Sequence, residues 1–308
     1  MEKKLDLSII VLSYNTKDLT VACLDSVIKN TSGIAYEIIV VDNNSADGSG
    51  QALKNLAEKQ SKVKLVLSQE NLGYPGGNNE GIKRAHGRYI LFLNSDTKIG
   101  DNVLGEMLGW MDKHPKVGIA SCALKNRDGS EQGTGGYFPT LPRVFSWMTI
   151  QDLPFVDSLI KPFHPVHHKA FVKGTSFYSQ AKQLDWVIGA FMLTRREVVE
   201  AVGPWDKEYF MYTEDVDYCY RAKKLGWQIW YLPNWSIIHY GGASSPIGYP
   251  IINEFKGVKL FYKKHYPGWQ FPILRFILKV GALGRILLFG ILEGRKAAET
   301  YVQAFRTI

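Results

Sequence analysis

Four short apolar runs, each rich in β-branched residues, recur within the first hundred residues and constrain the fold more than any other feature. They are SIIVLSY (8–14), EIIVVD (37–42), VKLVLS (63–68) and RYILFLN (88–94). Segments with helical spacing separate them, so strands and helices alternate along the chain. Nearly continuous apolar strands are typical of a mainly parallel sheet with helices on both faces. The sequence therefore predicts an α/β protein.

Polar side chains follow three of these strands at their carboxyl ends. In a parallel sheet these ends share one edge, where ligands bind. The turn after the first strand, SYNTKD, lacks the glycine-rich motif of dinucleotide-binding enzymes, and the chain has no P-loop motif. The residues expected at the edge are Ser13, Tyr14, Asn15, Asp42, Asn43, Asn44, Asn94, Ser95 and Asp96.

Two carboxylates at this edge can bind different parts of a nucleotide diphosphate. Asp42 can accept a hydrogen bond from the imide N–H of uracil or thymine. Asp96 can hold a divalent cation against the phosphates, because hard cations prefer oxygen ligands. Taken singly, each aspartate is more simply explained as a turn or helix cap, so the prediction depends on both together.

Composition places the chain in a reducing compartment. The three cysteines, Cys23, Cys122 and Cys219, are odd in number, far apart and without metal-ligand spacing, which argues against a disulfide framework. The start MEKKLDLSIIVLSYN is a poor signal peptide, because Asp6 interrupts its short apolar stretch. We therefore expect a cytoplasmic protein.

The formal net charge of +8 lies in the C-terminal tail, where ten Lys/Arg follow position 254 against Glu293 and Glu299. The segment FPILRFILKVGALGRILLFGILEGRK is apolar, but its cations leave no stretch of about 18 uncharged residues that would span a bilayer. Arranged as one helix, it would lie on an anionic membrane with its cations toward the headgroups. The alternative is a helix packed on the domain or on another subunit. The clustered cations would be Arg275, Lys279, Arg285 and Lys296.

A set of short motifs carries a resemblance to a known family. SIIVLSYN, IIVVDNNSADGS, NLGYPGGNNEG, LFLNSD, TEDVDYCYR and IIHYGG occur in this order between about residues 6 and 245. Their order resembles family-2 glycosyltransferases of the GT-A fold, in particular bacterial rhamnosyltransferases. The resemblance implies a Rossmann-like GT-A domain over 1–245. Within it, about 1–130 would bind the nucleotide sugar and 131–245 would hold the acceptor and the catalytic base, followed by the amphipathic helical tail over 246–308.

The resemblance also implies a divalent metal, Mg²⁺ or Mn²⁺. LFLNSD matches the D-x-D metal motif of the family, but Asn94 replaces the first aspartate and leaves Asp96 as the anionic ligand. His239 matches a histidine that completes the metal site in some relatives, and its imidazole beside a carboxylate suits Mn²⁺. The predicted donor-binding residues are Ser13, Tyr14, Asn15, Asp42, Asn44, Asn71, Gly76, Asn78, Asn94, Ser95 and Asp96.

TEDVDYCYR has two explanations. Helix electrostatics alone accounts for Thr213 as a cap and for acids in the first turn. The resemblance instead implies that Asp215 is the general base, which takes the proton of an acceptor hydroxyl as that oxygen attacks the anomeric carbon and inverts it. The neighbouring Asp217 would bind acceptor or order the helix. The predicted acceptor-binding residues are Trp205, Asp206 and Glu214.

These features together predict an inverting, metal-dependent glycosyltransferase on the inner face of the cell membrane. It would extend a lipid-linked glycan in cell-envelope polysaccharide synthesis, as a monomer or a homo-oligomer. The first donor to consider is dTDP-L-rhamnose, and UDP-galactofuranose, UDP-glucose or another UDP-sugar fits equally, because thymine and uracil present the same imide edge.

Two other classes remain as alternatives. One is a catalytically inactive protein that binds sugar nucleotides or glycans, which the presence of Asp215 disfavours. The other is a nucleic-acid-binding protein, a possibility suggested by the isoelectric point of about 9.2. The cations accompany an apolar helix rather than exposed aromatic residues, so we expect no nucleic acid partner.

Overall fold

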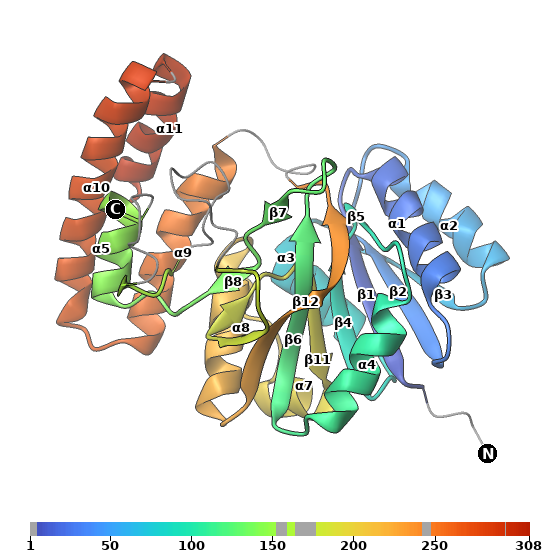
Figure 1. The fold of residues 1–308 in the computed structure, drawn as a ribbon. Coiled ribbons are helices and arrows are strands. Elements are labelled where there is room, and N and C mark those ends of the chain that lie inside the picture. Colours follow the sequence, from blue (N-terminus) through green and yellow to red (C-terminus); the bar gives the residue numbers. More distant parts are fainter. Residues whose placement is uncertain (1–4, 152–158, 164–176, 242–247, 293) are drawn as a thin grey trace.

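The computed structural model describes residues 5–151, 159–163, 177–241, 248–292 and 294–308. Its centre is a ten-stranded, mainly parallel sheet in which the main strand order is β3-β2-β1-β4-β11-β6-β12-β5 (Figure 1). The predicted α/β class is confirmed. The ten strands of this sheet are β1 (Leu7–Ser13), β2 (Tyr36–Asp42), β3 (Val63–Leu67), β4 (Tyr89–Asn94), β5 (Thr97–Lys98), β6 (Val117–Lys125), β7 (Glu131–Gln132), β9 (Lys182–Leu184), β11 (Phe191–Arg195) and β12 (Gln228–His239). A separate two-stranded sheet pairs β8 (Gly135–Gly136) with β10 (Trp186–Val187).

Helices cover both faces of the sheet. Side chains of α1, α2 and α4 form one apolar cluster with one face, and those of α7 and α8 form a second cluster with the other. The helices are α1 (Lys17–Asn30), α2 (Ser49–Lys59), α3 (Gly73–Ile82), α4 (Val103–Lys113), α5 (Leu141–Thr149), α7 (Arg196–Val202), the short 3-10 helix η1 (Lys207–Tyr209), α8 (Glu214–Lys224), α9 (Tyr249–His265), α10 (Gln270–Leu292) and α11 (Arg295–Arg306).

The glycines of α3 allow this helix to approach β1 closely. A Cβ at Gly77 would lie 2.2 Å from a methyl carbon of Leu12, and one at Gly81 would lie 2.4 Å from Ile10. Real Cβ atoms essentially never come so close to another atom, so a side chain at Gly77 or Gly81 would force Leu12 or Ile10 to move. The glycine-rich stretch of the sequence is therefore a helix–sheet contact as well as the start of a helix.

Two strands from the second half of the chain bring distant residues to the carboxyl edge of the sheet. The antiparallel strand β11 begins beside the end of β4, where Phe191 pairs with Leu93. The strand β12 ends there as well, because its last residue, His239, pairs with Thr97 of β5. Positions near 94, 190 and 239 consequently meet at one edge.

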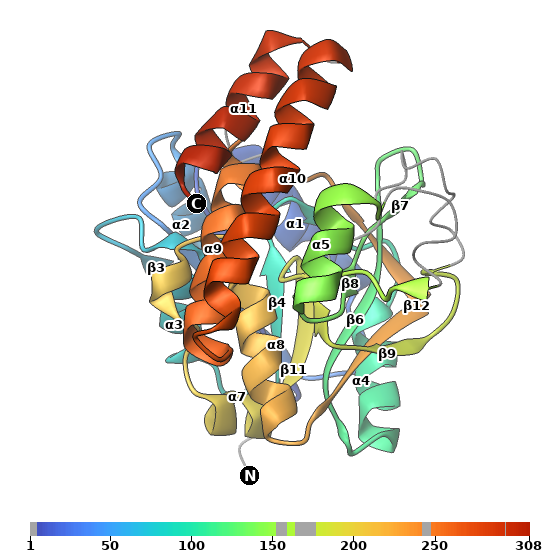
Figure 2. The same ribbon diagram turned by 90° about the vertical axis from the view of Figure 1, so that its left-hand side faces the viewer.

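The C-terminal region differs from the single helix expected from its sequence. It forms three helices, and α11 folds back on α10 beside α5 and α9 (Figure 2). Gly294 has a φ of 87°, which glycine adopts without strain and which reverses the chain between α10 and α11. Lys296 consequently lies on a different helix from Arg275, Lys279 and Arg285.

One face of α10 packs on the protein and the opposite face is exposed. Gly281 contacts α5 so closely that a Cβ would lie 2.5 Å from Met148, and the Arg285 guanidinium donates to the Trp147 carbonyl oxygen. The side chain of Leu287 is 70% exposed and that of Ile291 is 83% exposed. The outer face of α10, as we call it, comprises Ile273, Phe276, Val280, Leu283, Leu287, Leu288, Ile291 and Leu292.

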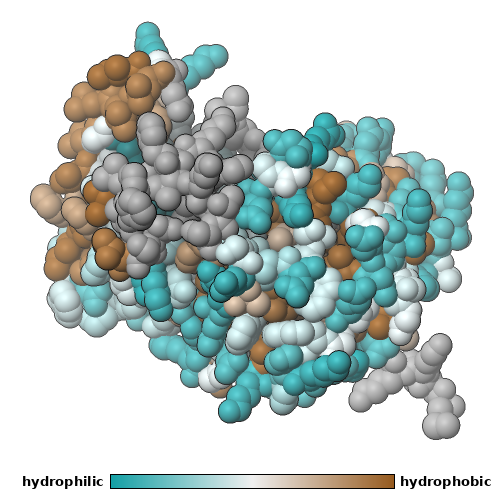
Figure 3. Space-filling model, viewed as in Figure 1, coloured by the Kyte–Doolittle hydropathy of each residue, from teal (hydrophilic) through white to brown (hydrophobic). Residues whose placement is uncertain are grey.

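Hydrophobic residues gather visibly over the end of the molecule that carries α10 (Figure 3). Arg285 points inward and stacks over Trp147 with 5.4 Å between its guanidinium carbon and the ring centre. The expectation that Arg285 faces solvent with the other cations is therefore wrong. Among the helices that the structure describes, none is both long and apolar enough to cross a membrane.

Candidate active site

Asp96 and His239 form a pair at the carboxyl edge of the sheet. The Asp96 Oδ1 lies 3.4 Å from the His239 Nε2, and both residues are less than a tenth exposed. The pairing of β5 with the end of β12 produces this contact, and the Tyr240 amide donates to the Asp96 carbonyl oxygen at 2.9 Å. The side chains are therefore held together by backbone as well as by their own contact.

The pair has the spacing of two ligands of one cation. Two donors about 2.1 Å from a metal and about 90° apart lie about 3 Å from each other. The Asn94 amide nitrogen is also 3.4 Å from the His239 Nε2, so its side chain can offer an oxygen at the same place after rotation. The described residues hold no group of three or more His, Cys, Asp or Glu suited to a metal. A cation here would consequently take its remaining ligands from Asn94, a donor diphosphate and water.

Asp215 is buried in the first turn of α8. Its Oδ1 accepts the Val216 amide at 2.8 Å, and its Oδ2 accepts the Gly189 amide at 3.2 Å. Burial raises the pKa of Asp215 to about 6, although these amide donors act in the opposite direction. This carboxylate can therefore both take up and release a proton near neutral pH.

Glu214 lies beside Asp215 and is also buried. Burial and then the Asp215 charge raise the pKa of Glu214 well above its usual value. Its Oε2 has no hydrogen-bond partner among the described residues. Two buried neighbouring carboxyl groups favour a state in which one is protonated and one is ionised, which is typical of sites of proton transfer.

Tyr74 and Gly189 connect Asp215 with the Asp96 end of the site. The Tyr74 hydroxyl donates to the Gly189 carbonyl oxygen at 2.7 Å, and the Gly189 amide donates to Asp215. The next residue, Ala190, accepts the Asn94 amide at 3.0 Å. Burial and then the charges of Glu214, Asp215 and Asp96 raise the pKa of Tyr74 well above its usual value. These contacts therefore link the two acidic centres at the carboxyl edge of the sheet.

Asp42 ends β2 at the same edge. It is buried, and its Oδ1 has no hydrogen-bond partner among the residues that the structure describes. The backbone beside it is unusual, because Asn15 and Asn44 have φ values of 52° and 65°. Left-handed backbone at non-glycine residues is uncommon and often marks functional loops. An unpartnered buried acceptor of this kind fits an imide N–H.

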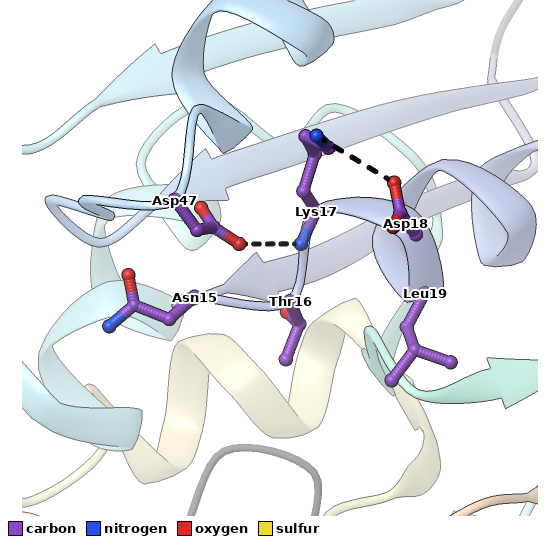
Figure 4. Close-up of a pocket in the computed structure, with 6 residues that line it drawn as sticks. All are labelled: Asn15, Thr16, Lys17, Asp18, Leu19 and Asp47. Atoms are coloured by element: carbon purple, nitrogen blue, oxygen red, sulfur yellow. Dashed lines mark hydrogen bonds and ion pairs between the residues drawn. The ribbon is translucent and has the colours of Figure 1, made fainter.

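A cavity of about 300 Å³ lies beside these loops, at the start of α1 (Figure 4). The Lys17 amide donates to the Asp47 carboxylate across it at 2.9 Å. Asp47 also accepts the Ser49 amide at 3.0 Å, so one carboxylate serves the first turns of both α1 and α2. The cavity is lined by Asn15, Thr16, Lys17, Asp18, Leu19 and Asp47.

Several predicted donor-binding residues support the site from within. Ser13 is fully buried and its hydroxyl contacts that of Thr20 at 3.0 Å, while the Ser95 hydroxyl contacts that of Thr16 at 3.1 Å. The Asn71 oxygen accepts from the side chain of Asn43 and from the Gly73 amide. Asn78 and Gly76 are buried within α3, whereas Tyr14 is half-buried and Asn44 exposed.

Two residues predicted to bind acceptor are occupied elsewhere. Trp205 is 1% exposed and stacks on Tyr218 with ring centres 4.5 Å apart, so its side chain belongs to the core. Asp206 accepts from Lys264 of α9 at 2.6 Å. Thr213, expected to cap α8, has a φ of 74° and forms no side-chain cap hydrogen bond within the described structure. The cap expected of Thr213 is therefore wrong, and the acceptor-binding roles expected of Trp205 and Asp206 stay predictions.

Asp217 faces away from Asp215 and ties α8 to α9. Its Oδ1 lies 2.6 Å from the His265 Nε2, and its Oδ2 accepts from Arg221 at 2.8 Å. Of the two roles considered for Asp217, the structure shows the ordering of the helix. Sequence reasoning did not identify Tyr74, Gly189 or Gln132, which contacts His239, because their contacts join positions more than a hundred residues apart.

Comparison with known proteins agrees with this architecture. The sequence model of "Glycosyl transferase family 2" matches residues 8–203, about two thirds of the chain. The fold and the edge of acidic and amide side chains are those of an α/β protein whose ligand site lies at the carboxyl ends of its strands, and the match is more specific. The chain belongs to glycosyl transferase family 2.

Relatives include two bacterial rhamnosyltransferases. The N-acetylglucosaminyl-diphospho-decaprenol L-rhamnosyltransferase of Mycobacterium tuberculosis is 25% identical over 262 residues, which are 79% of each chain. The rhamnosyltransferase WbbL of Escherichia coli is 26% identical over 239 residues, 75% of this chain and 82% of the relative. The predicted resemblance to bacterial rhamnosyltransferases of family 2 is confirmed.

Solved structures show the same fold. A mannosyltransferase from Pyrobaculum calidifontis, in complex with GDP-Man and Mn²⁺, has a TM-score of 0.58 at 17% identity and covers 98% of this chain and 74% of its own. GalNAc-T7 with UDP, GalNAc and Mn²⁺ has a TM-score of 0.60 at 15% identity and covers 86% of this chain and 49% of its own. At this identity the likeness supports the fold alone.

Proposed function

We propose that this family-2 glycosyltransferase is an inverting, metal-dependent enzyme. It transfers L-rhamnose from dTDP-L-rhamnose to a hydroxyl of a lipid-linked glycan during cell-envelope polysaccharide synthesis. The observation that carries the proposal is the convergence of Asp215 and the Asp96–His239 pair on one edge of the sheet. The names of the rhamnosyltransferase relatives support this choice of donor and acceptor.

The chain's own residues divide the work. Asp215, with its pKa raised to about 6 by burial, accepts the proton of the acceptor hydroxyl. Asp42 receives the imide N–H of the base at its unpartnered Oδ1. Asp96, His239 and Asn94 would hold Mg²⁺ or Mn²⁺, which when bound supplies positive charge next to the departing diphosphate. Residues 1–130 then bind donor, and residues 131–245 bind acceptor and carry the base.

The donor is identified by a screen of dTDP-L-rhamnose, UDP-galactofuranose and UDP-glucose. Released nucleotide and sugar transfer to polyprenyl-diphosphate-linked N-acetylglucosamine are scored together, at pH 7.5 with Mn²⁺. We expect transfer with dTDP-L-rhamnose. If transfer occurs with a UDP-sugar and not with dTDP-L-rhamnose, the UDP-sugar is the donor and the proposed donor is wrong. Tight nucleotide binding without release from any donor would favour the alternative of a catalytically inactive binding protein.

We expect removal of the cation to abolish transfer. Treatment with EDTA, or the change Asp96→Ala, should lower kcat by at least about 100-fold, because the charge of the leaving diphosphate would lose its main stabilisation. Re-addition of Mn²⁺ should restore the EDTA-treated protein but not the variant. The change Asp101→Ala, at an exposed aspartate nearby in sequence, is the matched control. Full activity in EDTA would contradict the metal proposal.

We also propose that the outer face of α10 lies on an anionic membrane. Its apolar side chains are exposed together, and Trp269, which is 66% exposed, stands just before the helix. Aromatic residues of this kind prefer the membrane interface. Exposed cations lie on α10 at Arg275 and Lys279 and at the start of α11 at Arg295 and Lys296. A face of this composition binds anionic lipid through apolar burial and charge together.

Vesicle flotation tests the membrane proposal. Wild-type protein should float with vesicles that contain phosphatidylglycerol, and the double change Leu287→Glu/Ile291→Glu should abolish flotation. Leu225→Glu, at another exposed leucine beyond α8, should leave flotation unchanged. Dimerisation that the same double change disrupts, seen by sedimentation without vesicle binding, would instead show that α10 contacts a second subunit.

A further inference from the structure

The tautomer of His239 is not settled by its contacts at the metal pair. The His239 Nε2 lies 3.4 Å from both the Asp96 Oδ1 and the Asn94 Nδ2. A proton on Nε2 would point to Asp96, whereas a bare Nε2 would accept from Asn94 and bind a cation. A neutral imidazole binds a metal through the nitrogen that carries no proton, so the preferred tautomer affects how tightly the site binds a cation.

A chain of side-chain hydrogen bonds on the other side of the ring settles it. The chain begins at the turn between β6 and β7, where the Ser130 hydroxyl contacts the Asp128 Oδ1 at 2.6 Å. An ionised carboxylate only accepts, so the hydroxyl donates to it. The Ser130 oxygen is then free to accept the amide of Asn126, whose Nδ2 lies 2.9 Å away. This contact fixes which atom of the Asn126 side chain is nitrogen.

The direction continues through Gln132. Since the Asn126 Nδ2 donates to Ser130, its Oδ1 accepts the Gln132 Nε2 at 2.6 Å. The same Gln132 nitrogen donates to the His239 carbonyl oxygen at 2.7 Å, so both of its N–H groups are used. The Gln132 Oε1 therefore faces the His239 Nδ1 at 2.8 Å as an acceptor, and the ring proton lies on Nδ1.

We propose that Gln132 is a positioning residue that holds His239 with its proton on Nδ1 and its Nε2 bare toward Asp96, and that Asp128 sets the direction of this chain. The proposal rests on the metal site proposed above. This role also explains the short strand β7, because the pairing of β7 with β6 places Gln132 against the end of β12. Partners that fix the orientation and tautomer of a ligand histidine commonly change metal affinity by 10–100-fold when removed.

Two variants of the full-length protein separate positioning from packing. Gln132→Leu keeps similar volume but offers no acceptor to the ring. Gln132→Glu keeps an acceptor for the Nδ1–H and loses both donors. We expect Gln132→Leu to weaken Mn²⁺ binding, measured by electron paramagnetic resonance with dTDP present, by about 10–100-fold. Gln132→Glu should restore at least half of this loss on a logarithmic scale. Gln183→Leu, at an exposed glutamine of β9, is the matched control.

The second readout needs no metal. Long-range ¹H–¹⁵N correlation spectra of histidine-labelled, metal-free protein at pH 8 report which ring nitrogen carries the proton, with His239→Asn used for assignment. Wild type and Gln132→Glu should show the proton on Nδ1, and Gln132→Leu should show a shift toward Nε2. A wild-type proton on Nε2, or Mn²⁺ affinity unchanged within twofold in Gln132→Leu, overturns the proposal.

The two readouts keep this inference distinct from the proposed function. If wild-type protein binds no Mn²⁺, the metal proposal fails, and the tautomer in the metal-free spectra still decides whether Gln132 positions the ring. If wild type binds Mn²⁺ and Gln132→Leu binds it equally well, the positioning role fails and the metal proposal stands. Asp128→Ala, in the exposed turn, should shift the tautomer in the same direction as Gln132→Leu.

Discussion

Asp215→Asn should reduce the rate of sugar transfer by about 10²–10⁴-fold while leaving nucleotide binding within twofold of wild type. The asparagine keeps the size of the aspartate but cannot take a proton from the acceptor hydroxyl. The measurement is kcat for sugar transfer, together with dTDP affinity by calorimetry. The matched control is Asp185→Asn, at an aspartate that pairs with Lys223 on the far part of α8. Near wild-type transfer by Asp215→Asn would show that another group is the base.

The pH dependence of the wild-type enzyme tests the same role. The base acts only when ionised, and burial raises the pKa of Asp215 to about 6. The rate should therefore rise with pH, pass its midpoint near 6 and become constant above about 7. The Glu254 charge contributes to the raised pKa, so Glu254→Gln should move the midpoint to lower pH. If the rate instead falls as the pH rises through 6, the titrating group acts in its protonated form, as a general acid.

Asp217→Ala should lower the free energy of unfolding by about 3–5 kcal/mol. Asp217 is 1% exposed and joins His265 of α9 to Arg221 of α8. Without Asp217, the part-buried Arg221 guanidinium has lost its carboxylate partner. The free-energy cost of this unpaired charge exceeds the stabilisation that the ion pair itself contributes. Urea unfolding at pH 7 measures the loss. Glu208→Ala is the control, because its carboxylate is exposed and pairs with Lys264 at the surface, where about 1 kcal/mol or less is expected.

The stabilisation by Asp217 should depend on pH with a definite sign. Burial alone would raise the pKa of Asp217, but the hydrogen bonds and charges of His265 and Arg221 hold it below its usual value. A carboxyl group with a lowered folded-state pKa stabilises the protein at pH values above its unfolded-state pKa of about 4 and loses this effect as the pH falls. The difference between wild type and Asp217→Ala should therefore shrink below about pH 4.

The first four strands could be predicted because their signal is local. Runs such as EIIVVD are apolar over consecutive residues and stop at polar ones, and β2 (Tyr36–Asp42) occupies nearly the same residues. The insertion of β11 between β4 and β6 could not be predicted, because nothing within residues 191–195 indicates which strands they will pair with. The division of the tail into α10 and α11 depended on one glycine, Gly294, whose conformation the helical periodicity of the segment obscured.

The candidate site follows the same division. Asp42, Asp96 and Asp215 could be proposed as site residues from their residue type and motifs, and the structure brings them to one edge. Gln132, Tyr74 and Gly189 act through contacts with residues more than a hundred positions away, and no local pattern distinguishes them. The burial of Trp205 could not be predicted, because an aromatic residue next to an aspartate suits a sugar-binding site and a core equally.

The outer face of α10 has a practical consequence for work with the purified protein. Apolar side chains on this face, such as Leu287 and Ile291, are exposed to water in aqueous buffer. Concentrated samples should self-associate or adsorb to plastic unless a mild detergent or a lipid nanodisc covers the outer face of α10. Assays with short water-soluble acceptors can therefore be run without detergent only at low protein concentration, where two molecules seldom associate through this face.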